Sequence, residues 1–201
     1  HCERAGVRLY VHENWRWQAP LRALKESLDS GAIGAPFRAR IQYSNDFPVF
    51  DNQPGLRELG QFALADIGSH ILDLARFLFG DASRMYCETQ QVTPGIAGED
   101  VATVMLTMDR GMSVVCEISY ASHLEHGRFP ETYVLVEGPT GSLELGPDFW
   151  LRSTVGGETR SRRVVPPVYA WADPAYALAH ASMVACNANL LRALQGGIEA
   201  E

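Results

Sequence analysis

Apolar positions follow a helical period in two stretches of this chain. Residues 20–30 and 64–80 carry apolar side chains at every third or fourth position, which predicts amphipathic helices ending at Gly31 and Gly80. The apolar stripe of the second helix consists of Ile67, Ile71, Leu74, Ala75 and Leu78. A third helix is expected from the cap Asp173-Pro174 to Leu194.

Further stretches alternate with period two, which predicts strands. They cover residues 37–43, 84–92, 101–108, 112–120, 133–137, 142–145, 149–155 and 159–165. Glycine-containing turns join several neighbours into hairpins, so the fold is predicted to be α+β, with a large, mostly antiparallel open sheet and helices packed on one face. The uncovered face is then either wet or a subunit interface.

The start of the chain and one long connection have patterns of their own. Ala5-Gly6-Val7 is typical of a helix end, and residues 8–12 are predicted to form a strand after it. No helix start precedes that end, so we interpret the sequence as a piece of a longer protein. Residues 44–61 are irregular, and long connections of this kind often border a functional site.

Composition narrows the possible partners. The chain has 201 residues, of which 46% are hydrophobic and 20% charged, as in ordinary folded domains. Its net charge of −7 argues against nucleic acid or an anionic membrane as a partner, and no apolar run is long enough to span a membrane. The 4 cysteines are scattered without a C-x-x-C pair, so we expect a cytoplasmic protein.

Three polar residues mark one side of the second predicted helix: Asp66, His70 and Asp73. Residues three and four positions apart lie on the same helix face, so an acid and an imidazole can enter one cleft. Histidine titrates near neutral pH and a carboxylate can orient it, as a proton-transfer site requires. Structural hydrogen bonds account for the same spacing, and both interpretations stay open on these residues alone.

A second candidate segment, His12–Trp17, combines polar groups with two indoles. As a site rim, Asn14 or Arg16 can hold a hydroxyl or a phosphate while Trp15 packs on a ring. An amphipathic strand end with surface tryptophans has the same composition. His180, on the third predicted helix, faces either a cleft or the packed core.

Motifs for metal, nucleotide and nucleophile chemistry are missing from the sequence. His123 and His126 flank Glu125 but lack further ligands in register, so we expect no metal. The patterns G-x-G-x-x-G, G-x-x-x-x-G-K-[ST], H-E-x-x-H and G-x-S-x-G do not occur. The glycines of this chain therefore serve turns rather than a phosphate-binding loop.

Four stretches together resemble the Gfo/Idh/MocA family of oxidoreductases. Residues 11–17 (Val-His-Glu-Asn-Trp-Arg-Trp) resemble the family's strand end, and residues 28–36 resemble its helix-to-sheet turn. Residues 66–73 (Asp-Ile-Gly-Ser-His-Ile-Leu-Asp) match its D-x-G-x-H-x-x-D segment, the most specific of the four. Residues 136–143 are similar to its glycine-containing hairpin.

The resemblance implies an N-terminal Rossmann domain carrying NAD or NADP, followed by an α+β substrate-binding domain. Residues 1–12 are then the end of the Rossmann domain, and residues 13–201 form the substrate-binding and oligomerisation domain. The implied reaction oxidises or reduces a hydroxyl-bearing carbon of a sugar, cyclitol or similar small molecule. The implied assembly is a homodimer or homotetramer formed through the sheet.

By the same resemblance, Asp66 and His70 are the catalytic pair. His70 exchanges a proton with the substrate hydroxyl, while Asp66 holds the substrate or orients the imidazole. The other predicted site residues are Asn14, Arg16, Asp73 and His180 for the substrate, and Trp15 and Arg16 for the cofactor.

Two family features are missing, the nucleotide fingerprint and the catalytic lysine, because the single lysine, Lys25, precedes Glu26 in a different element. We therefore expect the chain to be inactive without its Rossmann domain. Two alternatives stay open. One is a non-catalytic binding or assembly module of the same fold. The other is a metal-dependent hydrolase that uses Asp66, His70, His123 and His126.

Overall fold

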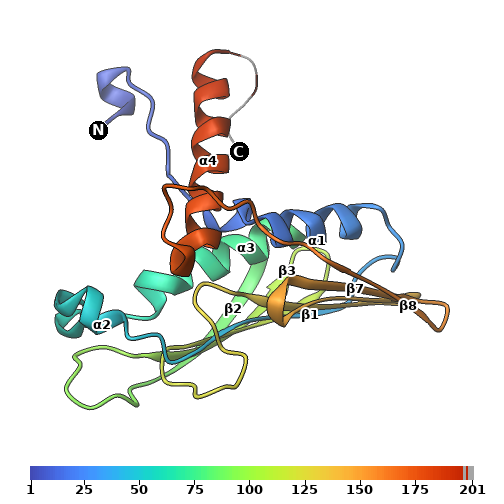
Figure 1. Cartoon of the computed structure of the whole chain (residues 1–201), viewed down its shortest axis with the longest axis horizontal. Helices are drawn as coiled ribbons and strands as arrows, with labels where there is room; N and C mark the ends of the chain where they lie inside the picture. The colour runs from blue at the N-terminus through green and yellow to red at the C-terminus, as the bar shows by residue number, and fades with distance from the viewer. Residues whose placement is uncertain (197, 199–201) are drawn as a thin grey trace.

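The computed structural model describes residues 1–196 and 198, and it contains a broad sheet with helices on one side (Figure 1). The strands are β1 (Arg38–Ser44), β2 (Ala82–Gln90), β3 (Val101–Met108), β4 (Ser113–Ser119), β5 (Tyr133–Gly138), β6 (Gly141–Gly146), β7 (Trp150–Val155) and β8 (Glu158–Arg163). The α-helices of the described residues are α1 (Ala19–Asp29), α2 (Val49–Asn52), α3 (Ser69–Phe79) and α4 (Ala177–Leu194). The predicted α+β class and the eight strands predicted from residue 37 onward are therefore confirmed, with ends shifted by a few residues.

The 8-stranded sheet has the order β2-β3-β4-β1-β5-β6-β7-β8. All neighbours are antiparallel except β1 and β4, which run parallel with Ile41 opposite Cys116. Strand β1 comes first in the chain but lies in the middle of the sheet, because the chain returns beside it through α3 and the β2–β3–β4 meander. The predicted hairpin turns are confirmed, and Gly111 and Gly157 adopt the left-handed φ of +83° and +84° that such turns favour in glycine.

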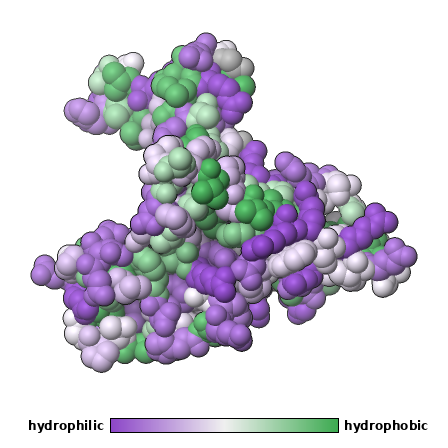
Figure 2. Space-filling view, in the orientation of Figure 1, coloured by the Kyte–Doolittle hydropathy of each residue, from purple (hydrophilic) through white to green (hydrophobic). Residues whose placement is uncertain are grey.

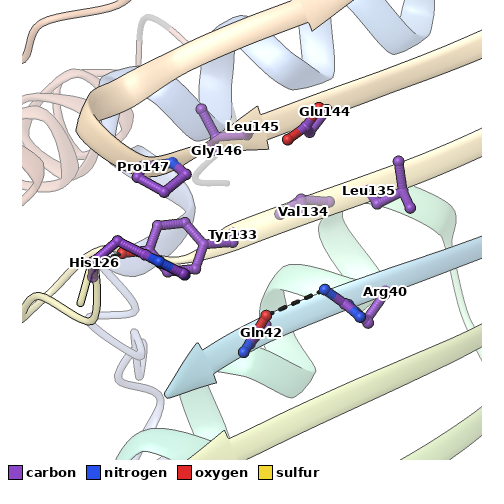
Figure 3. A pocket seen from close by; sticks show the side chains of 10 residues that line it. All are labelled: Arg40, Gln42, His126, Tyr133, Val134, Leu135, Glu144, Leu145, Gly146 and Pro147. Carbon is purple, nitrogen blue, oxygen red and sulfur yellow. Dashed lines mark hydrogen bonds between the residues drawn. The ribbon is translucent and has the colours of Figure 1, made fainter. Parts of the chain in front are cut away.

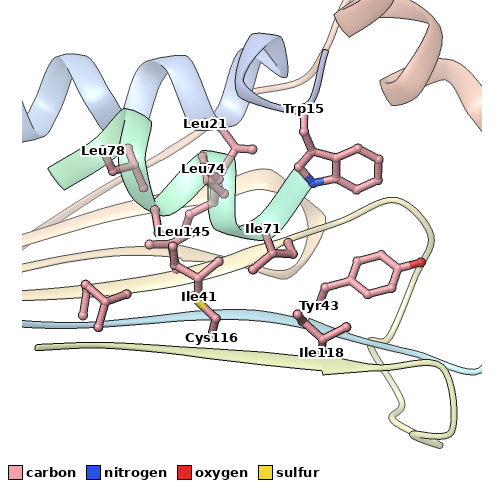
Figure 4. Close-up of a cluster of buried hydrophobic side chains, with 14 of the residues drawn as sticks. Trp15, Leu21, Ile41, Tyr43, Ile71, Leu74, Leu78, Cys116, Ile118 and Leu145 are labelled. Atoms are coloured by element: carbon pink, nitrogen blue, oxygen red, sulfur yellow. The ribbon is translucent and has the colours of Figure 1, made fainter. Parts of the chain in front are cut away.

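The hydrophobic core lies between the sheet and the helices α1 and α3 (Figure 4). On β1, Ala39, Ile41 and Tyr43 are at most 1% exposed, whereas Arg38 and Arg40 are exposed on the opposite face. The helices cover this apolar face with Leu21, Leu24, Leu28, Ile71, Leu74 and Leu78. Burying each side chain of this size stabilises the fold by about 1.5–3 kcal/mol. Because only one face of the sheet offers apolar partners, the helices pack on that side.

The N-terminal segment differs from its prediction. The helix end at Gly6 is confirmed, since Gly6 has a φ of +66° after a single 3₁₀ turn, Glu3–Ala5. The predicted strand 8–12 is wrong, because residues 7–12 belong to no strand and Leu9 and Val11 are 75% and 83% exposed. A strand needs a neighbour for its backbone groups, and these residues have none within the described part of the chain.

One long connection is more ordered than its sequence pattern indicates. The irregular passage 44–61 contains α2 and a 3₁₀ turn, Pro54–Glu58.

The predicted cap before the last helix is confirmed. Asp173 accepts a hydrogen bond of 2.9 Å from the backbone N–H of Ala175. None of the described helices has the length and apolar character that a membrane crossing requires.

Candidate active site

The helix that carries the candidate residues has an irregular start. Leu64–Gly68 form a π-helical turn, in which the N–H of Gly68 donates to the carbonyl oxygen of Ala63 at 2.8 Å. A Cβ on Gly68 would lie 3.2 Å from that oxygen, so the close turn favours glycine. Turns of this type are frequent at functional sites. Asp66 lies within the turn, whereas His70 belongs to the regular α3.

His70 is held by residues that precede α1. Its Nδ1 lies 2.7 Å and 2.8 Å from the two carboxylate oxygens of Glu13. Its ring stacks on Trp15 with a centroid distance of 4.7 Å and an interplanar angle of 21°. Trp15 is 4% exposed and donates through Nε1 to the hydroxyl of Thr132 at 2.8 Å. In the described residues, all hydrogen bonds of His70 pass through Nδ1, which leaves Nε2 without one.

The Glu13 carboxylate remains ionised in this half-buried position. Burial by itself raises its pKa, but the hydrogen bond and charge of His70, the backbone N–H of Trp15 and the charge of Arg16 oppose that effect. Their sum holds the pKa of Glu13 below its ordinary value. An ionised carboxylate accepts hydrogen bonds and cannot donate them, so the proton between Glu13 and His70 resides on Nδ1.

Asp66 is held by a different element. The hydroxyl of Tyr120, directly after β4, donates to Asp66 Oδ2 at 2.6 Å. Burial, then the neighbouring Tyr43 and Asp66, raise the pKa of Tyr120 far above its ordinary value, so this hydroxyl stays a donor. The ring of Tyr43 lies 5.5 Å from Tyr120 and 6.2 Å from Trp15, so packed rings connect Asp66 with His70. The imidazole itself is oriented by Glu13 rather than by Asp66.

Asp73 and Arg16 form a two-pronged ion pair between α3 and the 3₁₀ turn Trp15–Trp17. Arg16 Nε donates to Asp73 Oδ2 at 2.8 Å, and a terminal guanidinium nitrogen contacts Oδ1. The two side chains are 19% and 21% exposed. The Arg16 guanidinium also lies 5.2 Å from the ring centroid of Phe77. This pair therefore fixes the turn on the helix one turn beyond His70.

Of the two remaining predicted residues, Asn14 contacts α4 and His180 belongs to α4. Asn14 is 7% exposed and donates through Nδ2 to the hydroxyl of Ser182 at 2.7 Å, which ties its segment to α4. His180 lies among aromatic rings, 5.5 Å from Trp171 and 6.2 Å from Tyr176. Its Nδ1 is buried and has no hydrogen-bond partner among the described residues. The structure thus gathers Trp15, Arg16, Asp66, His70 and Asp73 around α3, while Asn14 and His180 lie toward α4.

An aromatic rim, formed by Phe47, Phe129 and Tyr176, joins three connections next to Trp15. Phe47 and Phe129 stack at 4.2 Å, and Phe129 lies 5.6 Å from Tyr176 and 6.5 Å from Trp15. The amide of Asn52 donates to the Tyr176 hydroxyl at 3.2 Å. The passage 44–61, the loop after β4 and the start of α4 therefore meet at this rim.

The histidines of the loop after β4 lie apart from this cluster. His123 Nδ1 is 3.0 Å from Asp46 Oδ2, and the two side chains are 84% and 57% exposed. His126 packs its ring 5.3 Å from Tyr133. Within residues 1–196 and 198, no group of three histidine, cysteine, aspartate or glutamate side chains is arranged to ligate a metal. A metal-dependent hydrolase has no ligand set in this part of the chain.

Sequence reasoning missed Glu13, Tyr120 and Thr132 as partners of the site. Glu13 is 57 positions from His70, and Tyr120 is 54 positions from Asp66, so no helical or strand spacing relates them. Glu13 lies inside the stretch 11–17, which resembles the strand end of the Gfo/Idh/MocA family. That position was the one feature of the sequence that could have indicated a role for Glu13. Tyr120 closes a predicted strand and reads there as an ordinary aromatic residue.

Comparisons with known proteins identify the family of this chain. The family model described as the GFO/IDH/MocA C-terminal domain matches residues 21–144. Two curated relatives, both named D-apiose dehydrogenase, are 43% identical over 198 residues in Paraburkholderia graminis and 40% identical over 172 residues in Rhizobium rhizogenes. The alignments cover 98% and 86% of this chain but 53% and 50% of the relatives, so the chain spans about half their length.

A solved structure is similar over the whole chain. An oxidoreductase from Agrobacterium radiobacter, in complex with NAD+, L-tartaric acid and magnesium, superposes with a TM-score of 0.95 at 37% identity. The superposition covers 100% of this chain and 58% of that one. The family match includes most of α1, the π-helical turn that carries Asp66, and α3, which carries His70. It also includes the strands β1 to β5. The chain therefore belongs to the GFO/IDH/MocA family and carries that family's C-terminal domain.

Proposed function

We propose that the chain is the substrate-binding half of an NAD(P)-dependent oxidoreductase that acts on a hydroxyl or carbonyl carbon of a small sugar or polyol. The observation that carries the proposal is the state of His70. Its Nδ1 is held by Glu13 at 2.7 Å, and within the described residues its Nε2 is left without a hydrogen bond. A positioned imidazole with one free nitrogen is a proton acceptor for a substrate hydroxyl.

In this proposal the residues of the chain handle the proton. A bound nicotinamide supplies the other half of the chemistry, because it accepts or donates the hydride. His70 Nε2 takes the proton of the substrate hydroxyl during oxidation and returns it to the carbonyl oxygen during reduction. Asp66 accepts from Tyr120 through Oδ2 and has its other oxygen available for a substrate hydroxyl. A positioned acid–base group of this kind contributes about 10²–10⁴-fold in rate.

The residues present fit only part of a dinucleotide. The sequence has no glycine-rich phosphate loop. Trp15, predicted to contact the cofactor, is 4% exposed and has little surface to offer. Arg16 retains 19% exposure beside Asp73 and is the better candidate for a cofactor contact. The phosphates of NAD or NADP are then bound by a separate Rossmann domain.

Apolar surface near the N-terminal segment supports this division into two domains. The segment and α4 project together from the helical side of the sheet (Figure 1), and Figure 2 shows apolar atoms on that projection. Its exposed apolar side chains are Val7 57%, Leu9 75%, Val11 83%, Leu191 59% and Leu194 59%. Exposed apolar side chains gathered on one projection are typical of a surface that another domain covers. We place residues 1–12 at the end of the Rossmann domain.

The relatives direct the search for a substrate toward small sugars. Both curated relatives carry the name D-apiose dehydrogenase, and we propose D-apiose as the first substrate to test. The aromatic rim of Phe47, Phe129 and Tyr176 lies beside Trp15 and offers ring faces and a hydroxyl. Aromatic faces pack on the C–H side of a sugar, while single polar groups orient its hydroxyls.

We further propose that the open sheet face pairs with a second copy of this chain. That face carries Tyr86, Met105 and Trp150 at 57%, 52% and 38% exposure, amid charged pairs such as Arg38–Glu137 at 2.5 Å. A hollow of about 340 Å³ opens on it between β1, β5 and β6, lined by residues that include Arg40, Gln42 and Leu135 (Figure 3). None of the predicted site residues lines this hollow, so the open face and the chemistry are separate.

Light scattering after size-exclusion chromatography tests the assembly. A Met105→Arg variant places a charge in the apolar part of the proposed pairing face and is expected to convert the dimer to a monomer. A wild-type protein that is monomeric at micromolar concentration contradicts the proposed pairing.

The free thiols support a reducing compartment. Cys2, Cys87, Cys116 and Cys186 are all unpaired, and burial raises the pKa of Cys116 to about 12. Thiols kept reduced are typical of the cytoplasm, which is where we propose the protein acts.

The decisive experiment follows nicotinamide absorbance in the full-length protein that carries this chain, with D-apiose and a panel of sugars, polyols and cyclitols. We expect turnover with at least one small sugar and loss of turnover in a His70→Ala variant. Unchanged kcat in that variant would favour the non-catalytic assembly module. The 201-residue chain by itself is expected to show no turnover, and measurable NAD(P)-dependent activity would contradict the two-domain proposal.

A further inference from the structure

A carboxylate that the reaction scheme above leaves unused makes the closest contact to the proposed base. Both oxygens of Glu13 lie within 2.8 Å of His70 Nδ1, and Oε1 also accepts from the backbone N–H of Trp15 at 2.8 Å. The Glu13 side chain is 17% exposed, and that of His70 is 27% exposed. Such a contact engages one ring nitrogen and leaves the other without a hydrogen bond in the described residues.

We propose that Glu13 is the positioning residue of the site, because it fixes the His70 tautomer with the proton on Nδ1 and thereby makes Nε2 the base that faces the substrate. This inference deepens the proposed function and rests on it for the reaction, but not for the tautomer. In solution an imidazole exchanges between two tautomers, and only one of them presents an unprotonated Nε2. A carboxylate on Nδ1 removes that ambiguity.

The surrounding contacts restrain the ring as well as its proton. The His70 ring stacks on Trp15 at 4.7 Å, so it cannot rotate out of the plane that Glu13 requires. Trp15 is itself anchored by its hydrogen bond of 2.8 Å to Thr132. The backbone carbonyl of Glu13 accepts a weak hydrogen bond from Cys186 Sγ at 3.7 Å. The positioning unit therefore joins α3, α4 and the loop before β5.

The proton balance of the reaction follows from this arrangement. In oxidation the substrate O–H bond breaks and an N–H bond forms at Nε2, while Nδ1 keeps its proton and its hydrogen bond to Glu13. The ring becomes an imidazolium whose charge is compensated by the Glu13 carboxylate at 2.7 Å. In reduction the same proton leaves Nε2 for the carbonyl oxygen. Glu13 is not protonated at any point.

Asp66 does not serve as this positioning group. Its Oδ2 accepts from Tyr120 at 2.6 Å, and the hydrogen bonds of His70 in the described chain all go to Glu13. The charged and titratable groups around Glu13 are His70 from α3, Arg16 from its own turn and Cys186 from α4. Arg16 is in turn paired with Asp73, so His70 is the principal side-chain hydrogen-bond donor that Glu13 faces.

The first test reads the tautomer directly in the 201-residue chain. Two-bond ¹H–¹⁵N spectra of histidine-labelled protein above neutral pH are expected to show His70 protonated on Nδ1. The Glu13→Ala variant is expected to shift His70 toward Nε2 protonation, whereas an Asp66→Asn variant leaves it unchanged. The ring of His123, paired with Asp46 at 3.0 Å on the surface, is the internal reference in all three samples. A wild-type His70 protonated on Nε2, or one unaffected by Glu13→Ala, overturns the inference.

The second test uses the full-length protein and the Glu13→Gln variant, which keeps an acceptor oxygen but removes the charge. We expect kcat to fall about 10–100-fold with KM within about threefold, and the acid limb of the pH–rate profile to move to lower pH. The direction follows because the lost carboxylate favoured the protonated ring. Glu26→Gln, at an exposed position of α1, is the matched control.

The outcomes separate this inference from the proposed function. A merely structural Glu13 would lower the folded fraction and leave the acid limb in place, which overturns the inference. Absence of turnover with every substrate overturns the proposed function, while the tautomer of His70 still decides the role of Glu13. If Glu13→Ala does not fold, the pH profile of Glu13→Gln decides in its place.

Discussion

In the described residues two carboxylates contact a histidine Nδ1, and the two contacts differ in nearly everything except that distance. Glu13 and His70 meet at 2.7 Å with side-chain exposures of 17% and 27%, whereas Asp46 and His123 meet at 3.0 Å with exposures of 57% and 84%. The first pair bridges a turn and α3 under a stacked indole. The second pair bridges two loops, and both of its side chains are largely exposed.

The difference shows what converts an ion pair into a candidate site. Exposed pairs are screened by solvent and lose side-chain entropy when they form, so they contribute little to stability or geometry. A half-buried pair with a second donor and a packed ring has one orientation only. Hydrogen bonding and the charge of His70 hold the pKa of Glu13 below its ordinary value despite its burial. For Asp46 the hydrogen bond of His123 lowers the pKa too, but no packing fixes the partner.

The largest predicted contrast concerns catalysis. In the full-length protein, His70→Ala is expected to lower kcat by about 10²–10⁴-fold, because it removes the positioned proton acceptor. His123→Ala is expected to leave kcat within about twofold, since that ring is 84% exposed and outside the cluster. Steady-state rates with the preferred substrate measure both. A comparable loss in the two variants would break the comparison.

A smaller effect is expected at the second carboxylate of the candidate site, Asp66. Tyr120→Phe removes the hydroxyl that donates to Asp66 at 2.6 Å and is expected to lower the free energy of unfolding by about 1–2 kcal/mol. The reason is that a half-buried acceptor loses its donor. Urea unfolding of the 201-residue chain measures it. As control, Tyr169→Phe keeps the ring that stacks on Trp171 at 5.3 Å and removes a hydroxyl that has no hydrogen bond in the described residues, so it should leave the unfolding midpoint unchanged.

The smallest predicted effect is the pH dependence of stability at Glu13. Its folded pKa is lower than its unfolded one, so its contribution is fully present above about pH 4.5 and is lost as the pH falls through the folded pKa. Glu13→Gln is therefore expected to cost about 1 kcal/mol at pH 7, with a difference that shrinks below pH 4.5. Thermal unfolding between pH 3 and pH 7 measures this trend, with Asp46→Asn as the exposed counterpart. A difference that grows on acidification would reverse the assigned sign.

The sequence predicted most of the fold because its signals are local. The alternation of Ala39, Ile41 and Tyr43 with polar neighbours indicates a one-sided strand wherever that strand pairs. The predicted strand 8–12 failed because its pattern is equally local, while a strand exists only beside a partner. The parallel pairing of β1 with β4 was likewise not contained in either segment's pattern.

The candidate site likewise combines residues that one short stretch supplies with partners that come from distant parts of the chain. Asp66, His70 and Asp73 were predicted as candidates because their spacing and the D-x-G-x-H-x-x-D resemblance lie within one short stretch. Their actual partners, Tyr120, Glu13 and Arg16, come from other elements. Even the helical spacing was altered locally, because a π-helical turn separates Asp66 from α3.

By itself the sequence determined which residues are apolar, where helices and strands form, and which side chains can move a proton. It did so because burial patterns and turn chemistry act over a few residues. Only the tertiary structure decided that Glu13 holds the imidazole, that Tyr120 holds Asp66, and that Trp15 packs beneath His70. Those contacts join residues more than fifty positions apart, and only the packing of α3 on the sheet and on the turn before α1 brings them within hydrogen-bonding distance.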